Sequence, residues 1–183
     1  MKSRFRAARP ARRNPPKAGS ARGKGSQKVR VRTVYLSYSW DSAIHKDWVS
    51  KFAFRLKANG VEVVVDQWSL SLGEHIARFM DKAVERSDFV LLICTPKYKK
   101  RADRGEGGVG YEQDLMIAER FVARSYNKFI LVLREGDPYS ALPKWIASHL
   151  AVDLRGDNYE EGNFQNLVEH LLHAPIPRRR REH

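Results

Sequence analysis

Cysteine is almost absent from this chain, and long apolar runs are missing altogether. One cysteine, Cys94, in 183 residues excludes an internal disulfide framework and fits a reducing compartment. No apolar stretch approaches the roughly 18 residues that a membrane-spanning helix needs. The N-terminus is basic but lacks the apolar segment of a secretory leader. We therefore expect a soluble, cytoplasmic protein with a single folded domain.

Acidic residues are missing from one end of the chain and scarce at the other. Residues 1–30 hold 11 Lys/Arg and no acid, while residues 178–183 hold four Arg and one Glu. Subtracting these ends from the totals of 34 and 21 leaves 19 basic against 20 acidic residues in between. Such blocks of like charge are typical of disordered tails. We therefore predict a tail at 1–29, a domain at 30–175 and a tail at 176–183, with weak nucleic-acid or anionic-membrane contact as the role open to the tails.

Clusters of metal ligands are also lacking. The six histidines are scattered and have no cysteine partners at zinc-ligand spacing. His45 and His75 are expected to be exposed helix residues rather than ligands. No serine lies in a G-x-S-x-G elbow, and no Cys/His pair suggests a nucleophile. The sequence thus predicts neither a metal site nor a hydrolase triad.

What the sequence does contain is an alternation of strand-like and helix-like segments. The predicted strands are rich in β-branched and aromatic residues, and they span 31–38, 61–65, 89–94, 129–133 and 151–154. We expect the most apolar of them, 89–94, to be central and 61–65 to be buried on both faces. The alternation predicts an α/β, flavodoxin-like three-layer fold with a five-stranded parallel sheet.

The predicted helices are marked by apolar residues at helical spacing. The first is capped by Asp41 or Ser42, ends at Asn59-Gly60 and carries a stripe of Ile44, Trp48, Phe52 and Leu56. Others begin just after Gly73, span about 111–124, and carry a last stripe from Phe164 to Leu172. Residues 95–110, rich in Lys, Arg and Gly, are expected to form a long loop.

Chemistry in such sheets gathers outside the carboxyl ends of the strands. This edge is predicted to collect residues after the first two strands: Tyr38, Ser39, Trp40 and Asp41 after the first, and Asp66, Gln67 and Trp68 after the second. Glu112 opens the helix that leaves the glycine-rich loop, where the helix dipole favours an ionised carboxylate. Trp48 is expected in the core, whereas Trp40 and Trp68 are placed in edge loops. Position alone favours Glu112 as a simple helix-start acid, and its convergence with the other edge residues favours a functional role.

Four ordered motifs carry a resemblance to a known family. The segment VYLSYSWD at 34–41 resembles the opening of TIR domains and their SEFIR relatives, and DQWSLSLG at 66–73 matches the D-x₃-L-x₂-G loop after their second strand. FVLLICTP at 89–96 and GGVGYE at 107–112 resemble bacterial members. The likeness covers about residues 33–155.

The resemblance implies an enzyme that cleaves NAD+ at the nicotinamide–ribose bond, by hydrolysis or cyclisation, with NAD+ as substrate and no further cofactor. Glu112 then matches the catalytic carboxylate, which stabilises an oxocarbenium-like ribose. The substrate-binding residues it implies are Tyr38, Ser39, Trp40, Asp66, His75 and Tyr111. Gly108 stands where many of these enzymes have Trp, so the packing on the nicotinamide side departs from the family pattern.

The same resemblance leaves a second function open. SEFIR-type domains serve as adaptors, so residues 67–75 are predicted alternatively to mediate self-association or contact with other TIR or SEFIR domains. The enzyme is expected in bacterial defence or stress signalling, and the adaptor in signal transduction. Because 183 residues leave room for only one domain, the resemblance also implies a separate sensor or activator protein.

Overall fold

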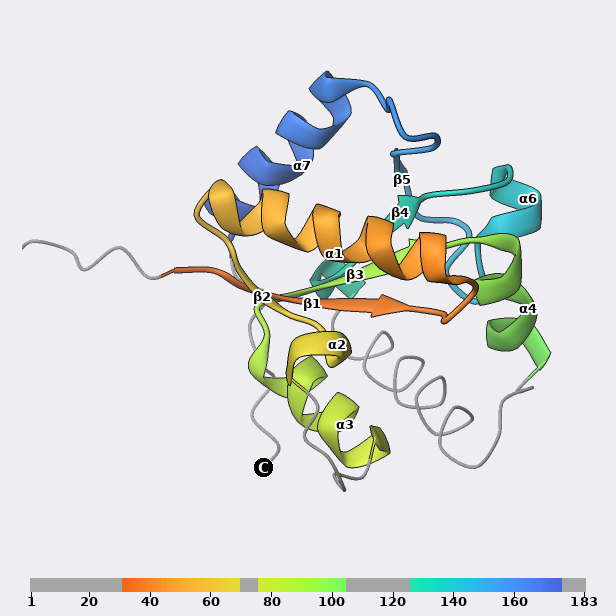
Figure 1. Ribbon diagram of the computed structural model, residues 1–183, viewed down its shortest axis with the longest axis horizontal. Coiled ribbons are helices and arrows are strands. Elements are labelled where there is room, and N and C mark those ends of the chain that lie inside the picture. Colours follow the sequence, from red (N-terminus) through yellow and green to blue (C-terminus); the bar gives the residue numbers. More distant parts are fainter. Residues whose placement is uncertain (1–30, 70–75, 105–125, 176–183) are drawn as a thin grey trace, which may run out of the picture.

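The computed structural model describes residues 31–69, 76–104 and 126–175. Five strands run through it: β1 (Thr33–Tyr38), β2 (Glu62–Val64), β3 (Phe89–Cys94), β4 (Phe129–Leu133) and β5 (Ala151–Asp153). The helices are α1 (Ala43–Ala58), α2 (Asp66–Ser69), α3 (Ile76–Arg86), α4 (Pro96–Arg104), α6 (Pro138–Ala141) and α7 (Glu161–His173), with a 3₁₀ turn at Tyr126–Lys128 (Figure 1).

The strands form one parallel sheet in the order β2-β1-β3-β4-β5. In the register of its centre, Leu36 of β1 pairs with Leu91 of β3, and Leu91 pairs in turn with Ile130 of β4. The flavodoxin-like fold class and the central position of residues 89–94 are therefore confirmed. The bounds of β3 and β4 match the predicted ones, and those of β1, β2 and β5 differ by one or two residues at their ends.

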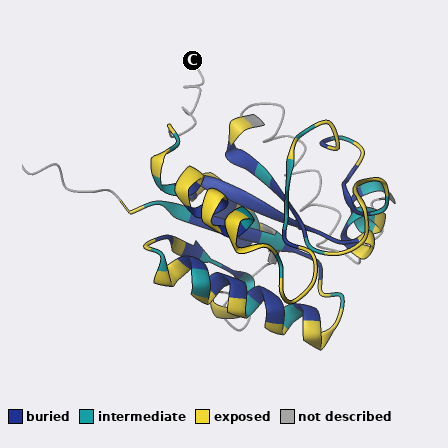
Figure 2. Ribbon diagram, turned by 90° about the horizontal axis from the view of Figure 1, so that it is seen from above, coloured by how far each residue is buried: buried dark blue, intermediate teal, exposed yellow. Residues whose placement is uncertain are grey.

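Both faces of the sheet are buried, and β3 shows this most clearly. Phe89, Leu91 and Ile93 belong to a core shared with α1 and α7. Val90, Leu92 and Cys94 belong to a second core, shared with α3, α4 and α6. Since successive side chains of a strand point to opposite faces, one apolar run supplies both cores. The buried residues accordingly lie in the middle of the molecule, along the sheet and the inner sides of the helices, and the exposed residues lie on the outer sides of the helices (Figure 2).

The edge strand β2 is less buried than predicted. Val61, Val63 and Val65 lie in the core, but Glu62 is exposed and Val64 is only half-buried. Among the described strands only β1 pairs with β2, which lies at the edge of the sheet. The expectation that this segment is buried on both faces is therefore wrong for those two positions.

Helix α1 follows the expected pattern with two corrections. Ser42 is the N-cap, its Oγ accepting the amide of His45 at 3.1 Å, and Gly60 (φ 85°) follows the helix end. Trp48 is buried as predicted, but Ile44 is 78% exposed and His45 is buried. At about 100° per residue, position 45 lies only about 20° around the helix from Phe52, whereas position 44 lies about 80° away. His45 rather than Ile44 therefore faces the core.

The predicted loop 95–110 is wrong in its first part, because residues 96–104 form α4. Thr95 caps this helix: its Oγ1 accepts the amide of Tyr98 at 3.0 Å, and its carbonyl accepts the amide of Lys99 at 2.9 Å. Pro96 then occupies the first helical position, where its missing N–H costs nothing. Only Tyr98 and Ala102 are buried, so the helix lacks the apolar stripe on which the sequence prediction relied.

Two short helices were not predicted, and both lie beside the carboxyl edge. Helix α2 begins at Asp66, so Trp68 lies in a helix rather than in an edge loop. Helix α6 is opened by Asp137, whose carboxylate accepts the amides of Tyr139 and Ser140. Helices α3 and α7 bury most of the predicted residues among those described, namely Phe79, Ala83, Val84, Phe164, Leu167, Val168 and Leu171. Met80 and Leu172 of the predicted stripes are only half-buried.

No helix among the described residues is both long and apolar enough to cross a membrane. The predicted tails at 1–29 and 176–183, the glycine-rich loop at 105–110 and the helix at 111–124 lie outside the described residues, so those expectations stay predictions.

Candidate active site at the carboxyl edge of the sheet

The carboxyl ends of β2, β1 and β3 lie side by side, because these strands are neighbours in the sheet. The chain leaves β1 toward the β2 side, whereas β3 lies on the other side of β1. Such a switch in direction opens a crevice in which ligands of α/β sheets bind. Of the predicted site residues, Tyr38, Ser39, Trp40 and Asp66 are described, and all four lie at this edge.

Asp66 joins two of the predicted residues. Its Oδ1 accepts the hydroxyl of Tyr38 at 2.7 Å, and its Oδ2 accepts the indole Nε1–H of Trp40 at 2.8 Å. Its Oδ1 also accepts the amide of Gln67 at 2.7 Å, which fixes the first turn of α2. Both carboxylate oxygens are therefore engaged within the protein, and Asp66 holds the aromatic residues in place.

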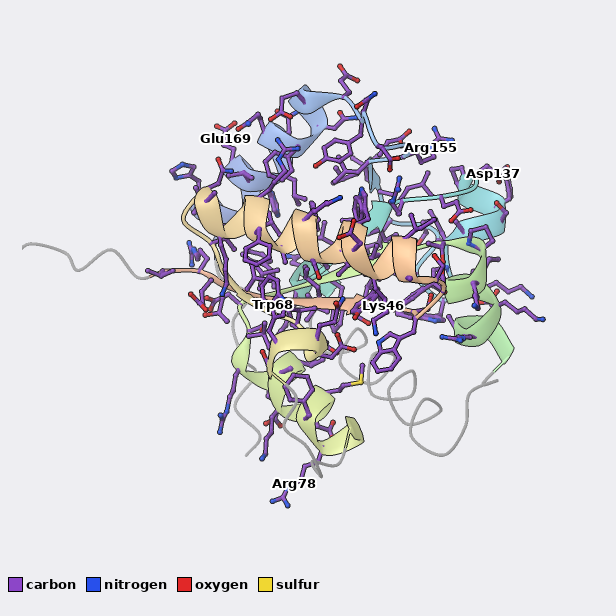
Figure 3. The ribbon with its side chains drawn as sticks, viewed as in Figure 1. Lys46, Trp68, Arg78, Asp137, Arg155 and Glu169 are labelled. Carbon is purple, nitrogen blue, oxygen red and sulfur yellow. The ribbon has the colours of Figure 1, made fainter. Side chains whose placement is uncertain are left out.

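Trp40 presents the exposed surface of this cluster. Its side chain is 48% exposed although its ring nitrogen is bonded to Asp66. The ammonium of Lys46, a residue labelled in Figure 3, lies 4.0 Å from the ring centroid of Trp40, a cation–π contact that covers part of the indole. An indole fixed at one end and open on its surface is suited to stacking on a planar ligand.

Ser39 belongs to a different cluster, around Asp41. The hydroxyl of Ser39 donates to Asp41 Oδ1, and the hydroxyl of Thr95 donates to Asp41 Oδ2 at 2.6 Å. Lys97 adds a hydrogen bond from its ammonium to the backbone carbonyl of Asp41 at 2.9 Å. Ser39 and Thr95 are fully buried, so the cluster ties the loop after β1 to the first turn of α4.

Sequence reasoning placed Asp41 at this edge and offered it as a helix cap, but it did not predict Asp41 as the acceptor of two buried hydroxyls. The available signal was a hydroxyl residue directly after each of the adjacent strands, Ser39 after β1 and Thr95 after β3, with a carboxylate two residues beyond the first. Buried hydroxyls need acceptors, and a carboxylate offers several.

His45 lies buried beneath the same loops. Its ring stacks on Trp48 with the centroids 6.5 Å apart, and its Nε2 has no hydrogen-bond partner. Burial lowers the pKa of His45, and nearby Arg134 and Lys97 lower it further, whereas Asp41 and Glu135 act to raise it. The ring is therefore held in its neutral form at neutral pH.

A separate open hollow of about 430 Å³ lies between β5 and the start of α7. None of the described site residues Tyr38, Ser39, Trp40 and Asp66 lines it. Its described walls are Asp153, Arg155, Gly156, Asn158, Tyr159, Glu160 and Asn163. Arg155 already pairs with Asp153, its Nε lying 2.9 Å from Asp153 Oδ1.

Reactive thiol and metal chemistry find no support among the residues that the structure describes. Burial raises the pKa of the Cys94 thiol to about 12, so it is not a nucleophile near neutral pH. In the same part of the chain no group of three or more His, Cys, Asp or Glu is arranged to hold a metal ion.

The remaining predicted residues, Glu112, Tyr111 and His75, lie outside the described residues, as does Gly108. The structure therefore unites Tyr38, Trp40 and Asp66 in one cluster and places Ser39 in the neighbouring one. The assignment of Glu112 as the catalytic carboxylate rests on the sequence.

Comparison with known proteins identifies relatives in both the TIR and SEFIR branches. A stretch of 86 residues is 27% identical to the NAD(+) hydrolase PdTIR of Paracoccus denitrificans; the alignment covers 47% of this chain and 28% of that protein. The chain thus spans under a third of the length of that hydrolase. A prokaryotic SEFIR domain of known structure matches with a TM-score of 0.67 and 30% identity, covering 83% of this chain and 99% of the other.

More distant structures share the fold alone. The TIR domain of the Toll-related receptor TRR-2 from Hydra magnipapillata matches with a TM-score of 0.54 at 16% identity, covering 75% of this chain and 96% of that one. The TIR domains of the activated Roq1 resistosome match with a TM-score of 0.55, also at 16% identity, covering 77% of this chain and 97% of the other. The profile of the TIR domain family matches residues 34–168. The chain therefore belongs to the TIR domain family.

Proposed function

We propose that this TIR domain cleaves NAD+ at the bond between nicotinamide and ribose. The observation that carries the proposal is the exposed indole of Trp40, fixed by Asp66 beside Tyr38 at the edge where α/β sheets bind nucleotides. The alignment with a protein named as an NAD(+) hydrolase supports it. NAD+ is the substrate here, and the proposal calls for no other cofactor.

The chemistry assigns each group a distinct task. When the C1′–N bond breaks, its electron pair goes to the pyridine nitrogen and nicotinamide leaves as a neutral molecule. The ribose left behind has oxocarbenium character, which the carboxylate of Glu112 stabilises. A water molecule then adds to C1′ and loses a proton, giving ADP-ribose; attack by an adenine nitrogen instead gives a cyclic product. Trp40 stacks on a planar part of the dinucleotide.

Binding and gating tasks fall to the other predicted residues. Ser39, His75 and Tyr111 are proposed to contact the nucleotide, whereas the engaged carboxylate of Asp66 acts through the aromatic residues that it holds. A separate sensor or activator brings domains together in cytoplasmic defence or stress signalling.

The test follows nicotinamide release by chromatography, using the full chain free in solution and clustered on beads. Wild type is compared with Glu112→Gln, which keeps the size of the side chain but removes its charge. We expect about a 100-fold loss of rate or more, as for the loss of one charge-stabilising group. Glu169→Gln on the outer side of α7 is the matched control and is expected to retain activity (Figure 3). Absence of release from clustered wild type, alongside a competent TIR enzyme, would refute the proposal.

An adaptor function is the second candidate, and one surface favours it. Phe54 of α1 is 62% exposed and Trp68 of α2 is 38% exposed, and their ring centroids lie 4.7 Å apart. Trp68 belongs to the predicted contact segment at 67–75, through which another TIR or SEFIR domain, or a second copy, would bind, and Phe54 enlarges its exposed aromatic surface. Binding to an immobilised copy that survives Glu112→Gln but is lost in Trp68→Ser favours the adaptor, whereas equal binding by both variants counts against it.

A further inference from the structure

Helix α4 differs from the other described helices in its charge. Its nine residues include five Lys/Arg against one acid, Asp103. The sequence predicted this segment as part of a basic loop. The proposed NAD+ cleavage does not use the outer surface of α4. As a helix it presents these charges in a fixed arrangement.

The buried side of α4 is apolar and its outer side is cationic. Tyr98 and Ala102, four residues apart, are buried against the sheet. Lys97 and Lys100 are exposed, and Arg101 is half-buried. Helix α4 lies at the end of the molecule where β1 and β3 finish, beside α6 (Figure 1). Its outer side therefore faces away from the sheet.

The lone acid of the helix is already engaged. Asp103 accepts the backbone amide of Lys144 at 2.9 Å and pairs with the ammonium of Lys99 at 3.2 Å. Lys97 donates to the carbonyl of Asp41, which is neutral and leaves the positive charge in place. In the described part of the chain neither Lys97 nor Lys100 forms an ion pair.

Elsewhere acids outnumber basic residues: outside α4 and Lys144, the described residues hold 11 Lys/Arg against 14 Asp/Glu. Lys51 pairs with Asp47, and Arg134 with Asp157. Further pairs join α1 to its surroundings and occupy the end of β5: Arg55–Glu161, Lys57–Glu62 and Arg155–Asp153. The surplus of positive charge in the described domain is thus concentrated on α4 and on the adjacent exposed Lys144.

We propose that this surface, formed by Lys97, Lys100 and Lys144, binds the phosphate backbone of a nucleic acid without reading its sequence. The basic positions of α4 at 97, 100 and 101 follow helical spacing over about 6 Å, which matches about two phosphates of one strand. An anionic membrane is the poorer fit, because a helix that lies on lipid needs an exposed apolar face and Tyr98 and Ala102 are buried.

The test measures binding of the full chain to a fluorescein-labelled duplex DNA over a series of salt concentrations. The double variant Lys100→Glu with Lys144→Glu is compared with Lys51→Glu with Lys82→Glu, which changes net charge equally at exposed positions on α1 and α3. We expect the first pair to lower affinity at least tenfold and to reduce the slope of log K against log salt by about 2, one for each lost phosphate contact. The control pair is expected to change affinity less than threefold.

Equal losses in the two double variants would show a mere effect of net charge and overturn the proposal. The proposal would also be overturned if the α4 variant kept its DNA affinity but lost binding to phosphatidylserine vesicles, because the surface would then bind membranes. Displacement of the DNA by polyglutamate at equal charge concentration would overturn it too, because any polyanion would then bind. Thermal unfolding of both variants, unchanged within a few degrees, confirms that each is folded. Nicotinamide release is measured in parallel, and its presence or absence leaves this proposal untouched.

Discussion

Asp41 and Asp66 invite comparison, since each accepts hydrogen bonds from two side chains at the carboxyl edge of the sheet. Asp41 receives the buried hydroxyls of Ser39 and Thr95 and connects β1 with α4. Asp66 receives the buried hydroxyl of Tyr38 but also the exposed indole of Trp40. The first carboxylate fastens two interior segments, and the second fixes a group that solvent and ligands can reach.

The chain between the two carboxylates explains how one short segment serves both. Tyr38 and Trp40 turn to Asp66, whereas Ser39 between them turns to Asp41. This is the alternation of an extended chain, continued past the end of β1. Shared chemistry therefore does not imply a shared role: we expect Asp41 to matter most for stability and Asp66 for the position of Trp40.

The largest effect is expected from Asp41→Ala. Removal of the carboxylate takes a charged acceptor from two buried hydroxyls, which should lower the free energy of unfolding by about 3 kcal/mol. Urea denaturation measures the change. The control is Asp47→Ala, which breaks only the exposed pair with Lys51 and should cost under about 0.5 kcal/mol. Similar costs for both variants would remove the structural role that we assign to Asp41.

The next effect concerns Gly136, which packs against the same side of the edge. It has φ +82°, and a Cβ there would lie 2.8 Å from Ser140 Oγ and 2.9 Å from Pro96 Cγ, at the start of α4. Gly136→Ala should therefore lower the free energy of unfolding by about 2–3 kcal/mol, combining backbone strain with overpacking. Gly156→Ala, at φ +77° with open space around the Cβ, isolates the backbone contribution of about 1 kcal/mol. Denaturation curves that rank the two variants in the opposite order would contradict this account.

For Asp66→Asn we expect a smaller loss of stability, about 1 kcal/mol, but a clear change at Trp40. The amide nitrogen cannot accept a hydrogen bond, so either the Tyr38 hydroxyl or the indole loses its acceptor. Acrylamide quenching of tryptophan fluorescence should increase in Asp66→Asn. The same substitution in a Trp40→Phe chain should leave quenching unchanged, and an increase there would place the change at another tryptophan.

The smallest effect is a pH dependence from His45. Its folded-state pKa lies below the ordinary 6.5 because the ring is buried, so the unfolded chain takes up the proton first as pH falls. The contribution to stability is complete above pH 6.5 and declines as pH drops from there toward the folded pKa. Tm measured from pH 8 to pH 5 should fall less steeply in His45→Gln. In Asp41→Ala the decline should extend to lower pH, because Asp41 acts to raise the pKa of His45.

The sheet could be predicted because each strand is a short apolar run that supplies both cores, and β3 is the clearest case. Helix α4 could not be predicted from an apolar stripe, because its described residues include only two buried side chains, Tyr98 and Ala102. Its start is fixed instead by the cap at Thr95 and by Pro96. His45 was misjudged because residue type was weighed above its angular position on α1.

The candidate site was predictable to the extent that strand order determines it. Parallel strands bring Tyr38, Trp40 and Asp66 to one edge, and the structure confirms that they meet there. Which donor each carboxylate accepts depends on side-chain directions beyond the strand ends, and no sequence pattern specifies these. Glu112 keeps its assignment from the motif series and awaits the nicotinamide assay.

The inert thiol of Cys94 has a practical consequence for spectroscopy. Because the only cysteine of the chain, Cys94, is fully buried and its pKa is raised to about 12, maleimide reagents should not react with it in the folded protein. A cysteine introduced at an exposed position of α4 or beside Trp40 would then carry a spin label or a fluorophore at a single site. The natural chain is thus ready for distance measurements between domains as they cluster, without prior removal of its own cysteine.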